Sequence, residues 1–531
     1  MLTIYKNGDI ITMSKEKLEE EKAECILVKD GKIEKIGTVK EIEEIAKKYN
    51  EEIHYKDLEG KTILPGFIDS HSHITALAQT LGLVSLKEVN TMKELVEALK
   101  NYKKERNITK GEWIIGFGYD NNFLKEQRHP NKLDLDILNE NPVLIAHVSG
   151  HMGVTNSLGL EKMKLSKETK NPEGGIIGKF ENGELNGYLE ETAFQQYGAS
   201  VLKMDDEKIV KLIKEAQKEY AKNGITTVQD GLIKKNEWNM LKTASDRESL
   251  FLDVVGYVEI MQNKDIINSN SEYVKKYNNH LKLGGYKLIL DGSPQGKTAW
   301  MSKPYEGEKE YRGYPTHSDE EVEEAVKESL KTNLQLLTHC NGDSASEQII
   351  KIYEKQDVNK VKESRPVMIH AQTVTKEQLE RIKKLKMIPS FFVAHTYYWG
   401  DIHKKNLGLR AEKISPVKTA KDLGIIYTFH QDSPVIEPNM LETIYCSVNR
   451  ITKEGKKIGE EECVEVYDAL KAITKNAAYQ YFEENKKGTI EEGKIADFVI
   501  LDKNPCKVKK EKIRDIKVLE TIKDGKTVYR G

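Results

Sequence analysis

Short apolar runs separated by amphipathic stretches recur along the middle of the chain. Eight of these runs are rich in branched and aromatic residues, which predicts β-strands, and the longer stretches between them have the apolar period of helices. The runs are residues 63–71, 225–229, 252–258, 286–290, 335–339, 367–370, 387–392 and 425–430. Strands that alternate with helices form parallel sheets, and eight such units predict a closed (β/α)8 barrel of the TIM type, an α/β fold.

The two ends of the chain have a different pattern, with short β-type runs and frequent turn residues. Cys25–Val28 near the start and Phe498–Leu501 near the end are examples. Each end alone is too small to bury much apolar surface, so two independent end domains are the less favoured alternative. We therefore expect residues 1–62 and 487–531 to pair into one small β-sandwich, and residues 63–486 to form the barrel.

The stretch between the first and second barrel runs is far too long for a single helix. It contains strand-like pieces of its own at residues 113–117 and 143–146. Because an unstructured loop of this length is uncommon inside a compact domain, we expect most of it to be ordered. The pattern predicts an inserted subdomain at about residues 76–220.

Composition narrows the class of protein. Of 531 residues, 38% are hydrophobic and 32% charged, which is typical of a globular chain. The net charge of −2 predicts neither a nucleic-acid partner nor a membrane partner. The five cysteines have no CxxC spacing, so neither a disulfide framework nor a cysteine zinc site is indicated. No run approaches the roughly 20 apolar residues of a membrane span, and we expect a cytoplasmic protein.

The first candidate for chemistry is the pair His71 and His73. In a strand, residues two apart point to the same face, so both imidazoles would lie side by side. Imidazole is a good ligand for zinc and related metals. Taken alone, such a pair is more often two ordinary core or surface histidines.

Further polar residues stand where other predicted strands end. His339 and His370 end the fifth and sixth runs, and Asp432 follows the eighth. Barrel enzymes assemble their active sites from the C-terminal ends of several strands. The combination therefore predicts a metal-dependent site at that edge of the barrel, although each histidine alone has a structural explanation.

These residues lie within stretches that resemble a known family. The sequence is similar to the amidohydrolase superfamily and, within it, to the Amidohydrolase 3 (YtcJ-like) branch, which includes N-substituted formamide deformylases. The matching stretches run in order along nearly the whole chain and are residues 64–73, 224–230, 287–293, 339–345, 370–372, 432–435 and 493–498.

The resemblance implies a two-metal centre. His71 and His73 would bind one ion, and His339 and His370 a second. Lys287 would bridge the ions as a carbamate formed with CO2, and Asp432 would act as both a ligand and a proton shuttle. An ordinary strand lysine is the alternative for Lys287, and a single ion is the alternative to two. Zinc suits this set of ligands, with manganese and iron left open.

Three further residues are candidates for binding substrate. Tyr119 and His151 lie in the predicted insertion, and His395 follows the seventh run. Loops and insertions carry much of the specificity of barrel enzymes, which favours a role in substrate binding. Scaffolding of the insertion is the alternative for the first two, and aromatic packing is the alternative for His395.

The resemblance implies hydrolysis of a carbon–nitrogen bond other than a peptide bond, in a linear amide or N-formyl compound. The alternatives are a cyclic amidase, a deaminase, and a barrel that binds without catalysis. All six metal positions hold competent residues, which favours an enzyme. One departure is that His430 and Gln431 stand where many members have small residues. The expected partner is a small amide substrate, and a homodimer is an alternative to a single chain.

Overall fold

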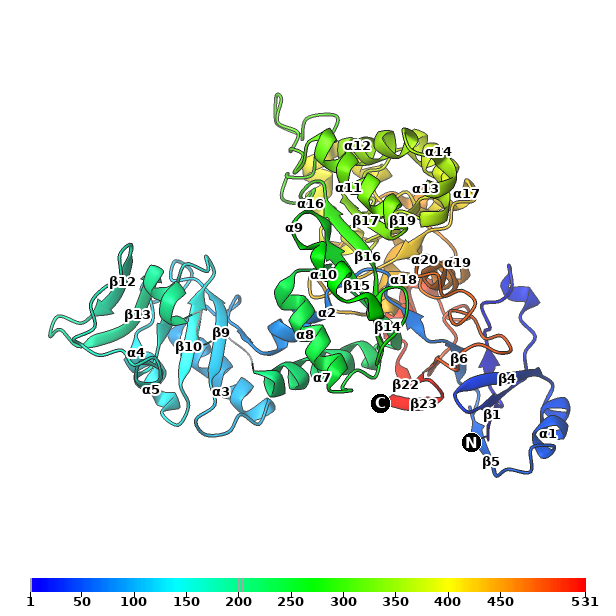
Figure 1. Cartoon of the computed structure of the whole chain (residues 1–531), viewed down its shortest axis with the longest axis horizontal. Helices are drawn as coiled ribbons and strands as arrows, with labels where there is room; N and C mark the ends of the chain where they lie inside the picture. The colour runs from blue at the N-terminus through cyan, green and yellow to red at the C-terminus, as the bar shows by residue number, and fades with distance from the viewer. Residues whose placement is uncertain (1, 199–200, 202–204) are drawn as a thin grey trace. The chain divides into compact units, whose positions relative to one another are not determined.

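The computed structural model describes residues 2–198, 201 and 205–531, and these form two compact units (Figure 1). The first unit comprises Met1–Thr75 and Ile213–Gly531, and the second comprises Ala76–Leu212. Helix α7 (Asp206–Lys222) begins in the second unit and ends in the first. Each unit has its own sheets and its own apolar core.

An eight-stranded parallel sheet forms the centre of the first unit, in the order β20-β19-β18-β17-β16-β15-β14-β7. Neighbouring strands in the sheet are consecutive strands of this set along the chain, as repeated βα units require. The strands are nearly continuous apolar runs because both faces of the sheet are covered. They are β7 (Phe67–Ile68), β14 (Ile225–Ile233), β15 (Asp253–Glu259), β16 (Leu281–Ile289), β17 (Gln335–Cys340), β18 (Val367–His370), β19 (Ile388–Phe391) and β20 (Thr428–Phe429).

The two edges of this sheet meet just beyond their last residues. The amide of His73 donates to the carbonyl of Ser433 at 2.8 Å, and the amide of Asp432 donates to the carbonyl of His71 at 3.1 Å. The segments after β7 and β20 are therefore joined by backbone hydrogen bonds. The parallel sheet is curled in the way expected of a TIM-type fold.

Amphipathic helices connect the strands, and several begin with a capping box. Ser318 and Glu321 cap α11, and Thr375 and Gln378 cap α14. Among the helices that the structure describes, none combines the length and the apolar character needed to cross a bilayer. The helices that follow the strands are α8 (Lys235–Asp246), α9 (Ile260–Asn263), α10 (Asp265–Ser269), α11 (Asp319–Lys331), α12 (Asp343–Glu354), α13 (Val358–Ser364), α14 (Lys376–Leu385), α15 (His395–Tyr398), α16 (Gly400–Leu407), α17 (Val417–Asp422), α18 (Met440–Asn449), α19 (Val466–Ala472) and α20 (Lys475–Gln480).

The first predicted barrel strand, residues 63–71, is divided between two sheets. β6 (Thr62–Pro65) pairs with β21 (Phe498–Leu501) of a separate sheet, and only β7 lies in the barrel. Pro65 has no amide hydrogen to continue a ladder. At Gly66, a β-carbon would lie 2.5 Å from the side chain of Thr226, so the chain passes very close to β14 there. These two residues allow the change of sheet.

Strand β16 begins at Leu281, earlier than the predicted run 286–290. Gly284 and Gly285 resemble a turn in the sequence, but they continue the strand. A β-carbon on Gly285 would lie 2.0 Å from the carbonyl oxygen of Gln335, so glycine allows β17 to approach closely. The extension places Lys287 near the end of a long strand rather than at the start of a short one.

The two ends of the chain form two further sheets, of which the first contains only N-terminal strands and the second combines strands from both ends. One has the order β4-β3-β1-β5 and the other β2-β6-β21-β22-β23. Ile26 and Ile63 pack with Phe498 and Ile522 in one buried cluster. The remaining elements here are β1 (Leu2–Lys6), β2 (Asp9–Ile10), β3 (Cys25–Lys29), β4 (Lys32–Gly37), β5 (Ile53–Asp57), β22 (Val518–Lys523), β23 (Lys526–Arg530) and α1 (Val39–Lys47).

The second unit is built on a six-stranded sheet in the order β12-β13-β11-β10-β9-β8. Its core includes Leu95 and Leu99 of a flanking helix, packed against Ile114 and Val143 of the sheet. The elements are α2 (Ile74–Leu81, which starts in the first unit), β8 (Val84–Ser85), α3 (Met92–Glu105), β9 (Ile114–Tyr119), α4 (Lys132–Leu135), β10 (Val143–His147), β11 (Met152–Thr155), α5 (Ser157–Lys162), β12 (Gly175–Lys179) and β13 (Leu185–Glu191).

Candidate metal centre

The carboxylate of Asp432 lies among three histidines at the C-terminal edge of the barrel. Its Oδ1 atom is 3.3 Å from Nε2 of His73 and 3.5 Å from Nε2 of His71, and its Oδ2 atom is 4.0 Å from Nε2 of His370. Two ligand atoms about 2.1 Å from a tetrahedral ion are about 3.4 Å apart. The spacing of His71, His73 and Asp432 therefore fits a shared cation.

The protonation of these groups also suits ligation. Burial alone would raise the pKa of Asp432, but the hydrogen bond with His73 and the nearby His370 and His71 outweigh it and hold this pKa well below its usual value. Burial, with the Lys287 charge next in importance, lowers the pKa of His71. Burial and the neighbouring His339 do the same for His370. Neutral imidazoles beside an ionised carboxylate are the forms that bind a divalent cation.

A hydrogen bond from His71 to Gln229 sets the orientation of the His71 ring. The Gln229 amide nitrogen donates to the carbonyl of Ser70 at 2.8 Å and to the hydroxyl of Tyr481 at 2.9 Å, and that hydroxyl donates to the carbonyl of Asp69. The Gln229 oxygen is thus left to accept from Nδ1 of His71, at 2.6 Å. The Nε2 lone pair of His71 then faces the cluster, as second-shell bonds commonly arrange for metal ligands.

Lys287 is fully buried next to this pair. Its Nζ atom lies 3.3 Å from Nε2 of His71. Burial lowers the pKa of the Lys287 ammonium to about 7, although Asp432 acts in the opposite direction. A neutral amine is the nucleophilic form that adds CO2, so this environment fits the carbamate implied by the resemblance.

His339 completes the set of predicted ligands, and its ring centroid is 4.5 Å from that of His370. Its Nδ1 atom is buried and forms no hydrogen bond with the residues that the structure describes. The carboxylate of Asp291 lies 3.3 Å from this atom and accepts backbone N–H bonds from Asn341, Gly342 and Trp300. Asp291 thus anchors the segment after β17, a role that the sequence analysis missed.

Three residues at the cluster have a left-handed backbone conformation. His370, Ala371 and Asp432 have φ values of 72°, 48° and 55°, in the left-handed region. Such conformations cost about 1–3 kcal/mol each and persist where the surrounding structure enforces them, often at functional sites. Here they turn the chain sharply as β18 and β20 end, so that the His370 and Asp432 side chains face each other.

His395 lies on α15 among aromatic rings. Its ring centroid is 4.6 Å from those of both Phe392 and Trp399. Its Nδ1 atom is 3.1 Å from Nε2 of His403. Nδ1 of His403 is buried and has no hydrogen-bond partner among the described residues. A buried lone pair without a partner is less costly than a buried N–H, so His403 donates from Nε2 and His395 carries its proton on Nε2.

The other two predicted substrate contacts, Tyr119 and His151, lie in the second unit. Tyr119 is buried at the end of β9, and its hydroxyl lies 3.1 Å from Nδ1 of His129. His151 is exposed, and its Nδ1 atom is 3.0 Å from a carboxylate oxygen of Glu191. Both side chains therefore have partners within their own unit.

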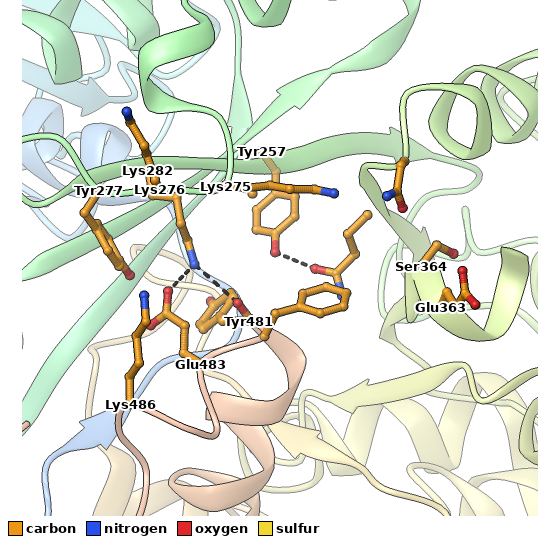
Figure 2. A pocket seen from close by; sticks show the side chains of 14 residues that line it. Tyr257, Lys275, Lys276, Tyr277, Lys282, Glu363, Ser364, Tyr481, Glu483 and Lys486 are labelled. Atoms are coloured by element: carbon orange, nitrogen blue, oxygen red, sulfur yellow. Dashed lines mark hydrogen bonds and ion pairs between the residues drawn. The ribbon is translucent and has the colours of Figure 1, made fainter. Parts of the chain in front are cut away.

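A hollow of about 420 Å³ lies at the opposite, N-terminal end of the barrel strands (Figure 2). Two pairs of its lining side chains are Lys282 with Glu483, and Tyr257, whose hydroxyl donates to Gln335. The C-terminal end, where the histidines gather, is the catalytic end of barrel enzymes.

A curled eight-stranded parallel sheet with histidines, a lysine and an aspartate at its C-terminal edge defines a barrel-type hydrolase site. The chain belongs to the amidohydrolase family, whose model matches residues 56–529. That range includes every residue of the cluster and confirms the resemblance inferred from the sequence.

Individual proteins agree with this assignment. The Bacillus subtilis (strain 168) protein YtcJ is 26% identical, over 100% of this chain and 99% of its own length. The N-substituted formamide deformylase of Arthrobacter pascens is 26% identical, over 96% of this chain and 95% of its own length. The crystal structure of an uncharacterized metal-dependent hydrolase from Pyrococcus furiosus superposes with a TM-score of 0.75 at 25% identity, covering 96% of this chain and 100% of that one.

Proposed function

We propose that this chain is a metal-dependent amidohydrolase that cleaves a non-peptide carbon–nitrogen bond in a linear amide or an N-formyl compound. The observation that carries the proposal is the position of Asp432, whose two oxygens face the Nε2 atoms of three histidines. An acid in that position can bind a cation and exchange a proton with a substrate beside it. The similarity to a formamide deformylase supports the N-formyl class.

Two divalent cations, most simply zinc, would be held by the cluster. His71 and His73 would hold one, and His339 and His370 the other. Lys287, as a carbamate, would bridge them, and Asp432 would complete the set. When bound, such ions supply Lewis acidity that lowers the pKa of water and polarises the amide carbonyl. Manganese and iron suit the same nitrogen and oxygen donors.

Asp432 would move the proton that hydrolysis requires. Water adds to the amide carbon, the C–N bond breaks, and the leaving nitrogen needs one proton to depart as an amine. Oδ1 of Asp432 faces His71 and His73, whereas Oδ2 has a longer separation, 4.0 Å, from His370. Oδ2 is therefore the oxygen that would accept the proton from water and deliver it to nitrogen, as a general base and then a general acid.

His395 would orient the substrate. Because its Nδ1 atom accepts from His403, its Nε2 atom carries a proton. We propose that this N–H donates to the substrate carbonyl oxygen, whose negative charge grows as water adds. His151 and Tyr119 are also proposed to bind substrate, as the sequence predicts.

The chain is also proposed to consist of a composite β-sandwich of residues 1–62 and 487–531, a barrel of residues 63–486, and an inserted subdomain at about residues 76–220. The sheet in which β6 pairs with both β2 and β21 supports the first part, because it joins the two ends of the chain, with β6 itself at the boundary with the barrel. Limited proteolysis that released residues 487–531 without loss of the fold would contradict this division.

The function is tested by a substrate screen with the purified full chain, loaded with zinc and bicarbonate. N-substituted formamides, linear amides, cyclic amides and aminated heterocycles are compared, and release of carboxylate, amine or ammonia is measured. Formate and amine from a formamide, absent with Asp432→Asn, would support the proposal. Ring opening or ammonia release alone would favour the cyclic amidase or deaminase alternative, and metal binding without any turnover would favour a binding barrel.

A further inference from the structure

A row of buried hydrogen bonds ends at Nδ1 of His370. The hydroxyl of Ser70 donates to the carbonyl of Phe429 at 2.8 Å, and the Ser390 hydroxyl lies 3.1 Å from that of Ser70. Nδ1 of His430 is 2.8 Å from the Ser390 hydroxyl, and its Nε2 atom is 3.1 Å from Nδ1 of His370. The row thus runs from a backbone carbonyl to a ligand of the candidate metal centre.

The hydrogen bond from Ser70 to the Phe429 carbonyl determines which group donates in each of the others. A carbonyl only accepts, so the single hydroxyl proton of Ser70 is used there, and Ser70 must accept from Ser390. Because the Ser390 hydroxyl proton is donated to Ser70, the Ser390 oxygen must accept from Nδ1 of His430. A neutral His430 with its proton on Nδ1 has a lone pair on Nε2, which accepts from Nδ1 of His370.

We propose that His430 is a positioning residue that holds His370 in the tautomer with its proton on Nδ1 and its Nε2 lone pair facing the metal. This role of His430 rests on the proposed function, because it requires His370 to be a metal ligand. The opposite tautomer of His430 would place the His370 proton on Nε2, where a cation must bind. It would also deprive the Phe429 carbonyl of its donor, because the Ser70 proton would be needed by Ser390.

Burial keeps this arrangement neutral and ordered. Ser70, Ser390 and His430 are fully buried, and His370 nearly so. Neighbouring imidazolium ions would repel each other in such a place, so both rings stay uncharged. The His430 ring is also packed against Phe392, at a centroid distance of 5.3 Å. His370 therefore depends on His430 for its tautomer as His71 depends on Gln229.

Two substitutions separate the hydrogen bond from the packing. His430→Phe keeps a ring in the space but removes the acceptor for Nδ1 of His370. His430→Gln places an amide oxygen that can still accept, while its nitrogen can donate to Ser390. His54→Phe, at an exposed position on β5, is the matched control. Circular dichroism and thermal melting establish that each variant folds.

Zinc affinity is measured for the full chain by competition with a chelator. Outer partners of this kind are worth about 10- to 100-fold in metal affinity, so His430→Phe should lose that much at one of two sites. His430→Gln and His54→Phe should stay within about threefold of the unsubstituted protein. Equal affinity in all variants, or equal losses in the phenylalanine and glutamine variants, would overturn the proposal.

A second measurement does not depend on metal. In the metal-free protein with ¹⁵N-labelled histidine, Nδ1 of His370 should have the shift of a protonated nitrogen and Nε2 that of an unprotonated one. A proton on Nε2 would overturn the assignment. If the protein bound no zinc yet showed the expected tautomer, the proposed function would fail while the hydrogen-bond order stood.

Discussion

Nε2 of His73 and Oδ1 of Asp432 lie 3.3 Å apart, although the two residues follow the first and last strands of the barrel sheet. The backbone bond from the His73 amide to the Ser433 carbonyl joins the same two segments. The contacts that join the two edges of the sheet therefore also bring these candidate metal ligands together.

Asp432→Asn should abolish turnover while the fold is kept, because the amide has the shape of the carboxylate but cannot accept a proton. The loss of kcat should be at least about 10²-fold. Steady-state kinetics with a substrate from the screen provide the measurement. Asp422→Asn, at a surface pair with Lys418, should leave kcat unchanged. An Asp432→Asn variant with near-normal kcat would remove the proton-transfer role.

Lys287→Ala should reduce the metal content from two equivalents to one, because the bridging carbamate cannot form. The unsubstituted chain should gain its second equivalent only when bicarbonate is present. Elemental analysis after gel filtration measures both effects, with Lys275→Ala at an exposed position as the control. Two equivalents bound by Lys287→Ala would contradict the bridging role.

His395→Phe should lower kcat by about 10²- to 10³-fold, the usual cost of losing one donor to a developing oxyanion. Its metal content should not change, because His395 is not among the proposed ligands. His403→Phe should have a smaller effect of the same kind, since it removes only the group that holds the His395 tautomer. A change in KM alone, without a change in kcat, would assign His395 to ground-state binding instead.

Asp253 offers a test of stability and its pH dependence. This buried carboxylate faces Lys487, Lys523 at 3.1 Å and His280 at 2.7 Å. Burial would raise its pKa, but the charges of Lys487 and Lys523 hold this pKa well below the usual value. After Asp253→Asn, Lys487 keeps Glu483 and Lys523 keeps Asp497 as partners, so the loss of this carboxylate should cost about 1.5–3 kcal/mol of unfolding free energy near neutral pH.

The sign of the pH effect follows from the direction of that shift. A depressed folded-state pKa contributes stability above the unfolded pKa of about 3.9, and this stability is lost as the pH falls further. The pKa of Lys523 is raised, burial notwithstanding, by Asp497 and Asp253, so its contribution is constant below about pH 10. Thermal melts should show a constant difference between Asp253→Asn and the unsubstituted chain from pH 5 to 9, shrinking below about pH 4. A difference that grew on acidification would contradict this account.

The elements that could be predicted from sequence are those whose pattern is local. Strands buried on both faces are continuous apolar runs, which is why β15 and β17 lie where the periodicity indicates. The prediction of one barrel strand at residues 63–71 was wrong in extent, because Pro65 and Gly66 allow one apolar stretch to contribute strands to two sheets. The placement of His73 beside Asp432 was predictable, since parallel strands end at one edge.

Other parts of the site depend on partners that no local pattern identifies. Gln229 stands in an apolar run, where a polar residue is the only sign of its bond to His71. The hydrogen bond between Ser390 and His430 joins the ends of two strands, and no sequence pattern connects these two residues. Asp291 acts through backbone amides after a different strand, so its role emerges only from the folded chain.

The pairing of β6 with β21 has a consequence for the order of synthesis. β6 is made before the rest of the barrel, whereas its partner at Phe498–Leu501 is made after the last barrel strand. His71 and His73 likewise wait for Asp432 and Ser433. A nascent chain therefore carries its first two candidate ligands through synthesis of the whole barrel without the groups that hold them, and capture of a metal by the complete set has to follow synthesis of the last barrel strand.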